Sequence, residues 1–346
     1  MSKKDVIVKI SLQKPITAVG FGIPLILATI QNKDVPYTEC STVDEVKELF
    51  PDTTVEDVTT EHVVTQAANL LFMQNNRPEK IAVCGTTKKA TAILPEIWEK
   101  DWRQLLIPTL NVEGEDSIPV ISNYIEAQED KMFFCSIDKY DDIQVTEGIS
   151  PTENDRTVVF FYDVEGSPVC PEAAIVGATA GLEAGSFTYK NIVIKGLTPV
   201  EKTDMEVTTI HNAGCITILR KCGDIVTSEG ITLSGEYIDI VDSKDWIIKD
   251  MEYGIQKTLI QLPKVPYDNV GIGILESQCA TTLKRGFNKG MIAVDDDGLP
   301  AYSTNFKKRS EVDAGDRTVR KYLGGGFTFD LAGAVHNVHI NGTVVV

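Results

Sequence analysis

The chain has 346 residues, of which 42% are hydrophobic and 24% charged, and its formal net charge is −17 at pH 7. This composition is typical of a folded globular protein with two or three domains, and its acidity argues against nucleic acid as a partner. No apolar run reaches the roughly 20 residues of a membrane helix, and the seven cysteines form no CxxC pair that would indicate a disulfide framework or a zinc knuckle.

An alternating segment opens the chain. Val6, Val8, Ile10 and Leu12 fall on one face of an extended backbone, and Pro15 ends the pattern. Polar residues interrupt the same segment, so it does not form the apolar stretch of a secretory signal. We predict a half-buried strand here, no export signal, and synthesis in a reducing cytoplasm.

Strands and helices alternate from about residue 24 to residue 190. This order predicts a three-layer α/β domain with a largely parallel sheet. The first helix follows a capping box of Thr42 and Glu45, and the last has Pro171 in its first turn. The predicted helices cover 42–51, 59–76, 89–102, 116–130 and 171–185, and the predicted buried strands cover 80–85, 131–137 and 156–162.

The pattern changes to α+β after Gly196. The expected elements are a helix at 203–212, a strand at 215–220, an extended piece at 231–241, a long helix at 242–262 and a second helix at 268–286. Residues 295–298, with the sequence DDDG, predict a hairpin turn. The last segment, 334–346, alternates like a strand and contains apolar residues that need a partner.

The four histidines do not form a metal or catalytic cluster. His336 and His339 are three residues apart in a predicted strand, so they face opposite sides. His62 lies at a helix start without an HExxH motif, and His211 lies at a helix end, where an imidazole is favourable as a cap. We predict no metal site.

Motifs of covalent and nucleotide chemistry are also missing from the sequence, which contains no GxSxG, GxxxxGK[ST] or GxGxxG. Asp239, Asp242 and Asp245 form a carboxylate cluster. Two carboxylates close together can act as a general acid and a general base. A helix cap at Asp242 or Ser243, with Asp245 in the first turn, explains the cluster without chemistry. We therefore predict no catalytic or cofactor-binding residues.

Residues 225–277 contain an ordered set of features. A strand with a glycine ends in Tyr-Ile-Asp, an Asp-Trp pair opens a long helix, and Pro-Tyr-Asp breaks the chain before a second helix. The matching residues are Gly235, Tyr237, Ile238, Asp239, Asp245, Trp246, Pro266, Tyr267 and Asp268. With the closing strand within 335–346, this stretch resembles the contractile tail sheath proteins of phages and phage-like particles, including bacteriocin and injection-system sheaths.

The resemblance implies a fold and a division of the chain. The fold class is α/β and α+β: a three-layer α/β domain, a C-terminal α+β sheath-core domain, and extended strand arms at both ends. The expected boundaries are an N-terminal arm at 1–15, the α/β domain at 16–196, the sheath core at 197–330 and a C-terminal arm at 331–346.

The resemblance also implies a structural function and no enzymatic activity. Subunits of such a sheath stack in six-fold rings around a tail tube and contract to drive the tube through a cell envelope. The expected partners are further copies of the chain, the tube protein, and baseplate and terminator proteins, without nucleic acid or membrane. Assembly would take place in the host cytoplasm, before the sheath becomes part of a virion or phage-like particle tail. The alternatives are a tube, terminator or baseplate protein, or an α/β enzyme with a divergent site near the strand ends of the first domain.

In that family, terminal arms add strands to a sheet of neighbouring subunits, which is β-augmentation. The alternative is that both termini close a sheet in their own domain. The residues that this resemblance places in inter-subunit strands are Val6, Val8, Ile10, Leu12, Val335, Val338, Ile340, Val344, Val345 and Val346.

The long helix at 242–262 is the element that we expect nearest the tube. One of its faces carries Asp245, Lys249, Glu252 and Gln256. Exposed charges of both signs favour a weak contact that breaks easily, as a sliding tube requires. We therefore expect these four residues to face the tube.

Overall fold

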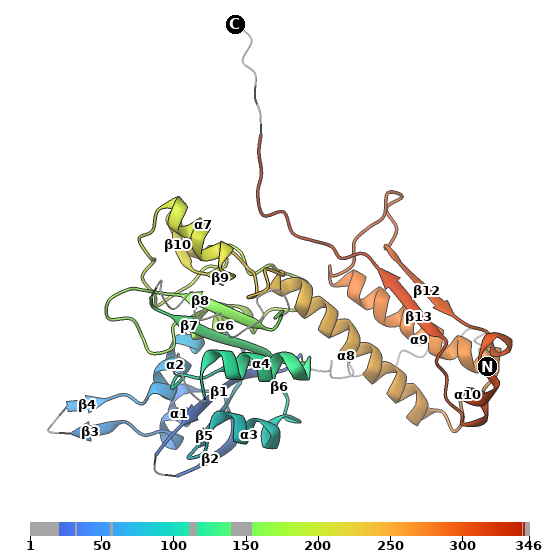
Figure 1. The fold of residues 1–346 in the computed structure, drawn as a ribbon, viewed down its shortest axis with the longest axis horizontal. Helices are drawn as coiled ribbons and strands as arrows, with labels where there is room; N and C mark the ends of the chain where they lie inside the picture. Colours follow the sequence, from blue (N-terminus) through green and yellow to red (C-terminus); the bar gives the residue numbers. More distant parts are fainter. Residues whose placement is uncertain are drawn as a thin grey trace, which may run out of the picture.

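The computed structural model describes residues 21–31, 33–55, 58–110, 116–139, 154–340 and 342. They form an α/β body and, projecting from it, an arm of two long helices covered by a two-stranded ribbon (Figure 1). The strand predicted at 6–12 lies outside the described residues. No described helix is both long enough and apolar enough to cross a membrane.

A seven-stranded sheet forms the centre of the body, in the order β2-β5-β1-β6-β7-β8-β9. Only β2 runs antiparallel to its neighbour. The strands are β1 (Ile23–Thr29), β2 (Val35–Cys40), β5 (Ile81–Thr86), β6 (Trp102–Leu106), β7 (Met132–Ile137), β8 (Thr157–Phe161) and β9 (Cys215–Ile216).

Helices cover both faces of this sheet, which confirms the predicted three-layer α/β architecture. Ile26 and Ala28 of β1 belong to one core, and Leu25 and Leu27 belong to the other, because alternate side chains of a strand point to opposite faces. The first core includes α1 (Val43–Leu49), α2 (Val63–Phe72) and α6 (Ala173–Thr179), and the second includes α3 (Ala90–Ile97), α4 (Ile118–Gln128) and α7 (Asp204–Asn212).

Capping residues set the start of several helices as expected. The Thr42 side chain accepts a hydrogen bond from the backbone N–H of Glu45, and Thr203 and Glu206 form a complete capping box. Asp268 caps the second long helix by accepting from two backbone N–H groups. These local signals do not depend on tertiary contacts, which is why the sequence locates them well.

The strand β6 was not predicted. The helix expected at 89–102 ends at Ile97, and Trp102 begins a central strand whose five residues are all buried. Its sequence, WRQLL, contains Arg103 and Gln104, so it lacks the continuous apolar pattern of a buried parallel strand. The helix expected at 171–185 is also shorter, since α6 ends at Thr179.

The boundary expected at residue 196 is wrong, because the body continues beyond it. Cys215 and Ile216 form β9, which pairs with β8 in the central sheet. The strand predicted at 215–220 is split into β9 and β10 (Ile218–Lys221). Two small antiparallel hairpins complete the body: β10 with β11 (Asp224–Thr227), and β3 (Thr53–Val55) with β4 (Val58–Thr60).

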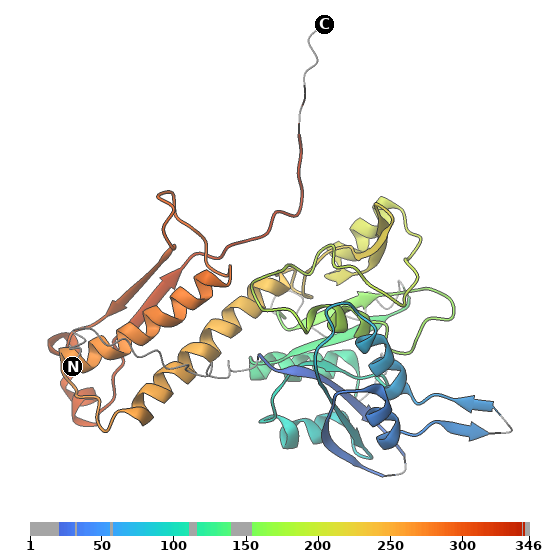
Figure 2. The same ribbon diagram turned by 180° about the vertical axis from the view of Figure 1, so that it is seen from behind.

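The arm contains α8 (Ile238–Gln261) and α9 (Asn269–Asn288), which pack side by side as a helical hairpin (Figures 1 and 2). An antiparallel ribbon of β12 (Tyr302–Phe306) and β13 (Gly325–Phe329) lies against α9. The ribbon loop contains a short 3-10 helix, η2 (Arg309–Glu311), and α10 (Ala314–Thr318). The predicted turn at 295–298 is present, because the Gly298 N–H donates to the Asp295 carbonyl.

The long helix begins one turn earlier than expected. It starts at Ile238, and Tyr237 occupies the N-cap position. The extended conformation predicted at 231–241 is therefore wrong from Ile238 onward. Since Asp242 lies inside the helix, the interpretation of Asp242 or Ser243 as a cap is also wrong.

Asp242 and Asp245 instead belong to a buried ionic network, which we call the root network: Arg103, Arg156, Tyr189, Asp242 and Asp245. Arg103 reaches both carboxylates, with N–O distances of 2.7 Å to each. Arg156 binds Asp245 through two nitrogens, at 2.7 and 3.0 Å. The Tyr189 hydroxyl donates to Asp242 at 2.8 Å. This network joins the first two turns of α8 to the sheet.

The network controls the charge state of Asp245. Burial would raise the pKa of this carboxyl, but Arg156 and Arg103 outweigh that effect and hold the pKa below its ordinary value. The pKa of Tyr189 is raised well above its ordinary range by burial and by the neighbouring Asp242. Asp245 is therefore an anion inside the folded protein, and the phenol of Tyr189 stays protonated as a donor.

We predict that Asp245→Asn lowers the free energy of unfolding by about 3 kcal/mol, because it leaves the buried Arg156 without its counter-charge. Urea denaturation of the monomeric protein measures this. Glu252→Gln, at an exposed position of the same helix, is the matched control and should change the value by no more than about 0.5 kcal/mol. Equal values for the two variants would contradict a stabilising role of the network.

The same variant tests the charge state by its pH dependence. A carboxyl whose pKa is lower in the folded than in the unfolded chain stabilises the fold above the unfolded pKa, about 3.9 for Asp, and this contribution is lost as the pH falls through the folded pKa. The difference between wild type and Asp245→Asn should therefore be full above about pH 4 and diminish on acidification. A difference that grows on acidification would contradict this.

Candidate assembly surfaces

The C-terminal segment runs from the ribbon toward the junction of body and arm, and its last described part extends away from both (Figures 1 and 2). Leu331 still bridges to Ile292, but the residues from Ala332 to Ile340 are in no strand. Val335, Val338 and Ile340 are 82%, 70% and 87% exposed. The described part of this segment therefore does not close a sheet in its own subunit.

The remaining residues predicted for inter-subunit strands lie outside the described residues. They are Val6, Val8, Ile10 and Leu12 near the amino end, and Val344, Val345 and Val346 at the carboxyl end. Their assignment to neighbouring subunits, like that of the three exposed residues above, stays a prediction.

The β12–β13 ribbon offers a surface that such strands can join. Its five residue pairs run from Tyr302 with Phe329 to Phe306 with Gly325. Within the part of the chain that the structure describes, each of the two strands is paired on one side only. Unpaired N–H and C=O groups at a strand edge are a template for pairing with another chain.

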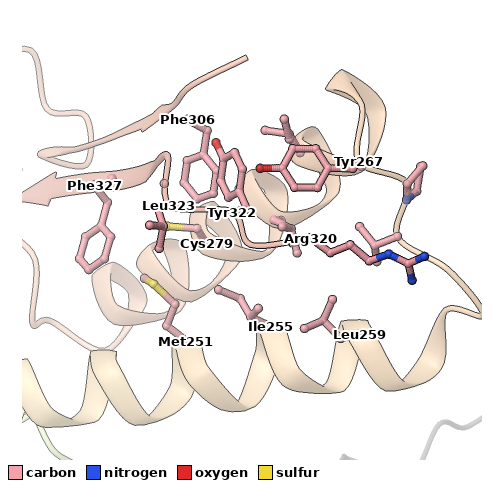
Figure 3. Close-up of a pocket in the computed structure, with 17 residues that line it drawn as sticks. Met251, Ile255, Leu259, Tyr267, Cys279, Phe306, Arg320, Tyr322, Leu323 and Phe327 are labelled. Atoms are coloured by element: carbon pink, nitrogen blue, oxygen red, sulfur yellow. The ribbon is translucent and has the colours of Figure 1, made fainter. Parts of the chain in front are cut away.

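An apolar groove of about 630 Å³ lies between the ribbon, α8 and α9 (Figure 3). Met251, Ile255 and Leu259 of α8 line one wall, and Tyr322 and Phe327 approach from the ribbon side. β13 therefore borders this apolar groove, which we call the trough. A separate hollow of about 950 Å³ lies along α8, where Glu252 and Gln256 belong to its lining.

The face of α8 beyond the body carries both charged and apolar side chains. Glu252 and Gln256 are exposed, and the half-exposed Lys249 lies 3.3 Å from Asp101 of the body. Asp245, expected on the same surface, is 8% exposed and part of the root network, so its prediction as a tube-facing residue is wrong. The reason is that the first two turns of α8 pack against the sheet. Exposed apolar residues on the helix are Ile248, Tyr253, Leu259 and Ile260.

The histidines make local contacts. His62 caps α2 by accepting from the Val64 N–H through Nδ1 at 3.3 Å, and His211 Nε2 lies 2.9 Å from the Ser228 hydroxyl. His336 is seated on the body, whereas His339 is exposed. In the described ranges, no group of three or more His, Cys, Asp or Glu side chains could hold a metal ion.

One buried carboxyl at the sheet edge was not singled out from the sequence. Glu172 lines a cavity of about 330 Å³ beside the carboxyl ends of β6 and β7. Burial raises its pKa to about 7, and the Cys170 thiol lies 3.3 Å away. Burial also raises the pKa of Cys170 well above its ordinary value, so this thiol stays neutral. A cysteine nucleophile needs a thiolate, so the pair does not provide one.

Comparison with known proteins gives no match to a family profile or to a curated protein sequence. Solved structures do match. The helical sheath of the anti-feeding prophage (AFP) in its contracted state is similar with a TM-score of 0.72 at 16% identity, over 99% of each chain. A chain of the AFP baseplate gives 0.71 at 15% identity, over 100% of each chain.

A crystal structure of the sheath tail protein from Desulfitobacterium hafniense is also similar, with a TM-score of 0.58 at 9% identity, over 94% of this chain and 99% of that one. The resemblance found in residues 225–277 thus extends, as a likeness of fold, over nearly the whole chain. The identities are low, so the likeness concerns the fold. The chain has the fold of the tail sheath proteins of contractile phage-like particles.

Proposed function

We propose that this protein is the subunit of a contractile tail sheath, which polymerises in stacked six-fold rings around a tail tube. The observation that carries the proposal is the likeness of fold to the AFP helical sheath over 99% of both chains. The partners would be further copies of the chain, the tube protein, and baseplate and terminator proteins. Assembly in the host cytoplasm would precede incorporation into a particle tail.

Subunits would be linked by strand addition at the β12–β13 ribbon. The exposed Val338 and Ile340 fall on one face of an extended strand, together with Val344 and Val346. That face suits the apolar trough bordered by β13. Burying one such side chain contributes about 1.5–3 kcal/mol, so the apolar contacts add to the backbone hydrogen bonds that β-augmentation supplies.

Contraction would be a rearrangement of rigid subunits. The strand links persist as hinges while the bodies dock on one another in a new way, and the free energy of the new interfaces drives the tube. The outer face of α8 would meet the tube. Its exposed Glu252 and Gln256 and half-exposed Lys249 favour a weak contact, because exposed charges contribute little individually and are easily separated.

A baseplate component is the second candidate, because a chain of the AFP baseplate has the same fold. A baseplate protein need not polymerise without its partners. A sheath subunit contains the strands that link it to further copies of itself, so it can polymerise alone. An enzymatic function has less support, since the similar structures are sheath and baseplate proteins.

Negative-stain electron microscopy of the purified protein tests the main proposal. We expect hollow, striated cylinders, because the trough, the ribbon and the exposed C-terminal segment all belong to one chain. Small uniform particles at every protein concentration would contradict the sheath proposal, and ring-shaped particles of fixed size would favour the baseplate candidate.

Strand addition makes a prediction specific to one face of the segment. The double substitution Val338→Asp and Ile340→Asp should abolish cylinders and leave the melting temperature unchanged, because both side chains are exposed in the monomer. The matched control, Asn337→Asp with His339→Asp, introduces two carboxylates on the opposite face and should still assemble. Equal loss of assembly in both variants would contradict the face assignment.

The α8 contact with the tube predicts a selective defect for Glu252→Lys. Co-expression with the tube protein of the same particle should give fewer tube-filled sheaths, while empty cylinders form normally. Glu79→Lys, at an exposed position of the body, is the matched charge reversal. The same fraction of tube-filled sheaths in both variants would place the tube contact elsewhere.

A further inference from the structure

The side chain of one histidine, His336, attaches the C-terminal segment to the body. The His336 side chain is only 9% exposed, although Val335 and Val338 on either side of it are largely exposed. The last backbone attachment before it is the Ala332 N–H, which donates to the Met291 carbonyl at 2.9 Å. Among the described residues 333–340, His336 makes the only polar side-chain contacts with the rest of the subunit.

Thr188, Glu229 and Tyr237 form the site that holds this imidazole, which we call the seat. Its Nε2 lies 2.9 Å from Thr188 Oγ1, and its Nδ1 lies 2.9 Å from Glu229 Oε1. The Tyr237 ring stands at 84° to the imidazole, with 4.9 Å between ring centroids. Thr188 precedes Tyr189 of the root network, and Tyr237 precedes the first residue of α8. The seat therefore lies where the body meets the arm.

Oxygen atoms of the seat lie against both nitrogens of the imidazole. The Glu229 carboxylate only accepts, and its contact with Nδ1 is short but poorly aligned for a hydrogen bond. The Thr188 hydroxyl donates to Asp239 Oδ1 at 3.5 Å, which leaves its oxygen free to accept from Nε2. Both ring nitrogens thus face acceptors.

Charged groups surround the imidazole. Lys190 Nζ binds Glu229 Oε2 at 2.7 Å, and Asp239 adds a second carboxyl through its contact with Thr188. Burial would raise the pKa of Glu229, but Lys190 and His336 outweigh it and lower the pKa. His211 and Lys221 also interact with Glu229, and burial lowers the pKa of His211.

We infer that His336 is the anchor that fixes where the C-terminal segment leaves the subunit. Its contacts with Thr188, Glu229 and Tyr237 hold the segment at this point. Without the anchor, the segment is free from Ala332 onward, and four more extended residues lengthen its reach by about 14 Å.

The consequence for assembly rests on the proposed sheath function. Val338 and Ile340 follow the anchor by two and four residues, so a fixed His336 pre-positions the apolar face that would enter a neighbouring subunit. Pre-organisation reduces the ordering cost of association. The anchor itself is a property of the single subunit and is tested on the monomer.

Fluorescence anisotropy of a dye beside the anchor tests the inference. Cys222 is exposed and the other six cysteines are buried, so Val338→Cys in a Cys222→Ser background accepts the dye selectively. Measured on the monomer fraction, anisotropy should be high while His336 holds the segment. Adding His336→Ala should reduce it, because this change removes the contacts with Thr188, Glu229 and Tyr237.

Two variants act as controls. His339→Ala removes the exposed neighbouring histidine, so the anisotropy should stay high. Thr188→Ala removes the partner of Nε2, so the anisotropy should fall part of the way. Equal anisotropy of His336→Ala and its parent would overturn the inference. Cylinder formation is scored separately, so absence of cylinders with the expected anisotropy difference would reject the sheath function and leave the anchor in place.

Discussion

Two arginine side chains that are buried with their carboxylate partners determine how α8 is attached. Arg103 lies in β6 and Arg156 directly precedes β8, whereas Asp242 and Asp245 come from the helix, and the pairs meet at 2.7 Å. Moving the helix by one turn would leave charges unpaired in the protein interior, which costs several kcal/mol per charge. Tyr189 completes the network, because its hydroxyl donates to the carboxylate oxygen of Asp242 that Arg103 does not bind.

A subunit with this attachment is well suited to transmit force in a sheath. The body and the helical arm are joined through buried, directional contacts, while the C-terminal segment has few contacts of its own. Rearrangement would therefore occur at the links between subunits rather than within them. The seat of His336 lies at the same junction, beside Thr188 and Tyr237. The C-terminal segment thus leaves the subunit close to the root network.

The sequence predicts those features that depend on neighbouring residues. Helix starts at Thr203 and Asp268 and the apolar parallel strands follow from capping and periodicity. It does not predict β6, because Arg103 interrupts its apolar pattern, or the role of Asp242, whose partner is 139 residues away in the chain. The sequence places Asp245 in the first turn of a helix for the same reason, since its arginine partners are also distant in the chain. The alternating C-terminal residues indicate a strand. Local sequence does not specify whether this strand joins a sheet of its own subunit or of a neighbouring one.

Helical reconstruction of the assembled cylinders by cryo-electron microscopy tests the central claim, that the subunits are linked through the β12–β13 ribbon. The account predicts additional strands beside this ribbon, contributed by neighbouring subunits, with Val338 and Ile340 directed toward the α8 trough and His336 still seated at Glu229 of its own subunit. A ribbon that remains two-stranded, with the C-terminal segment folded onto its own body, would contradict it.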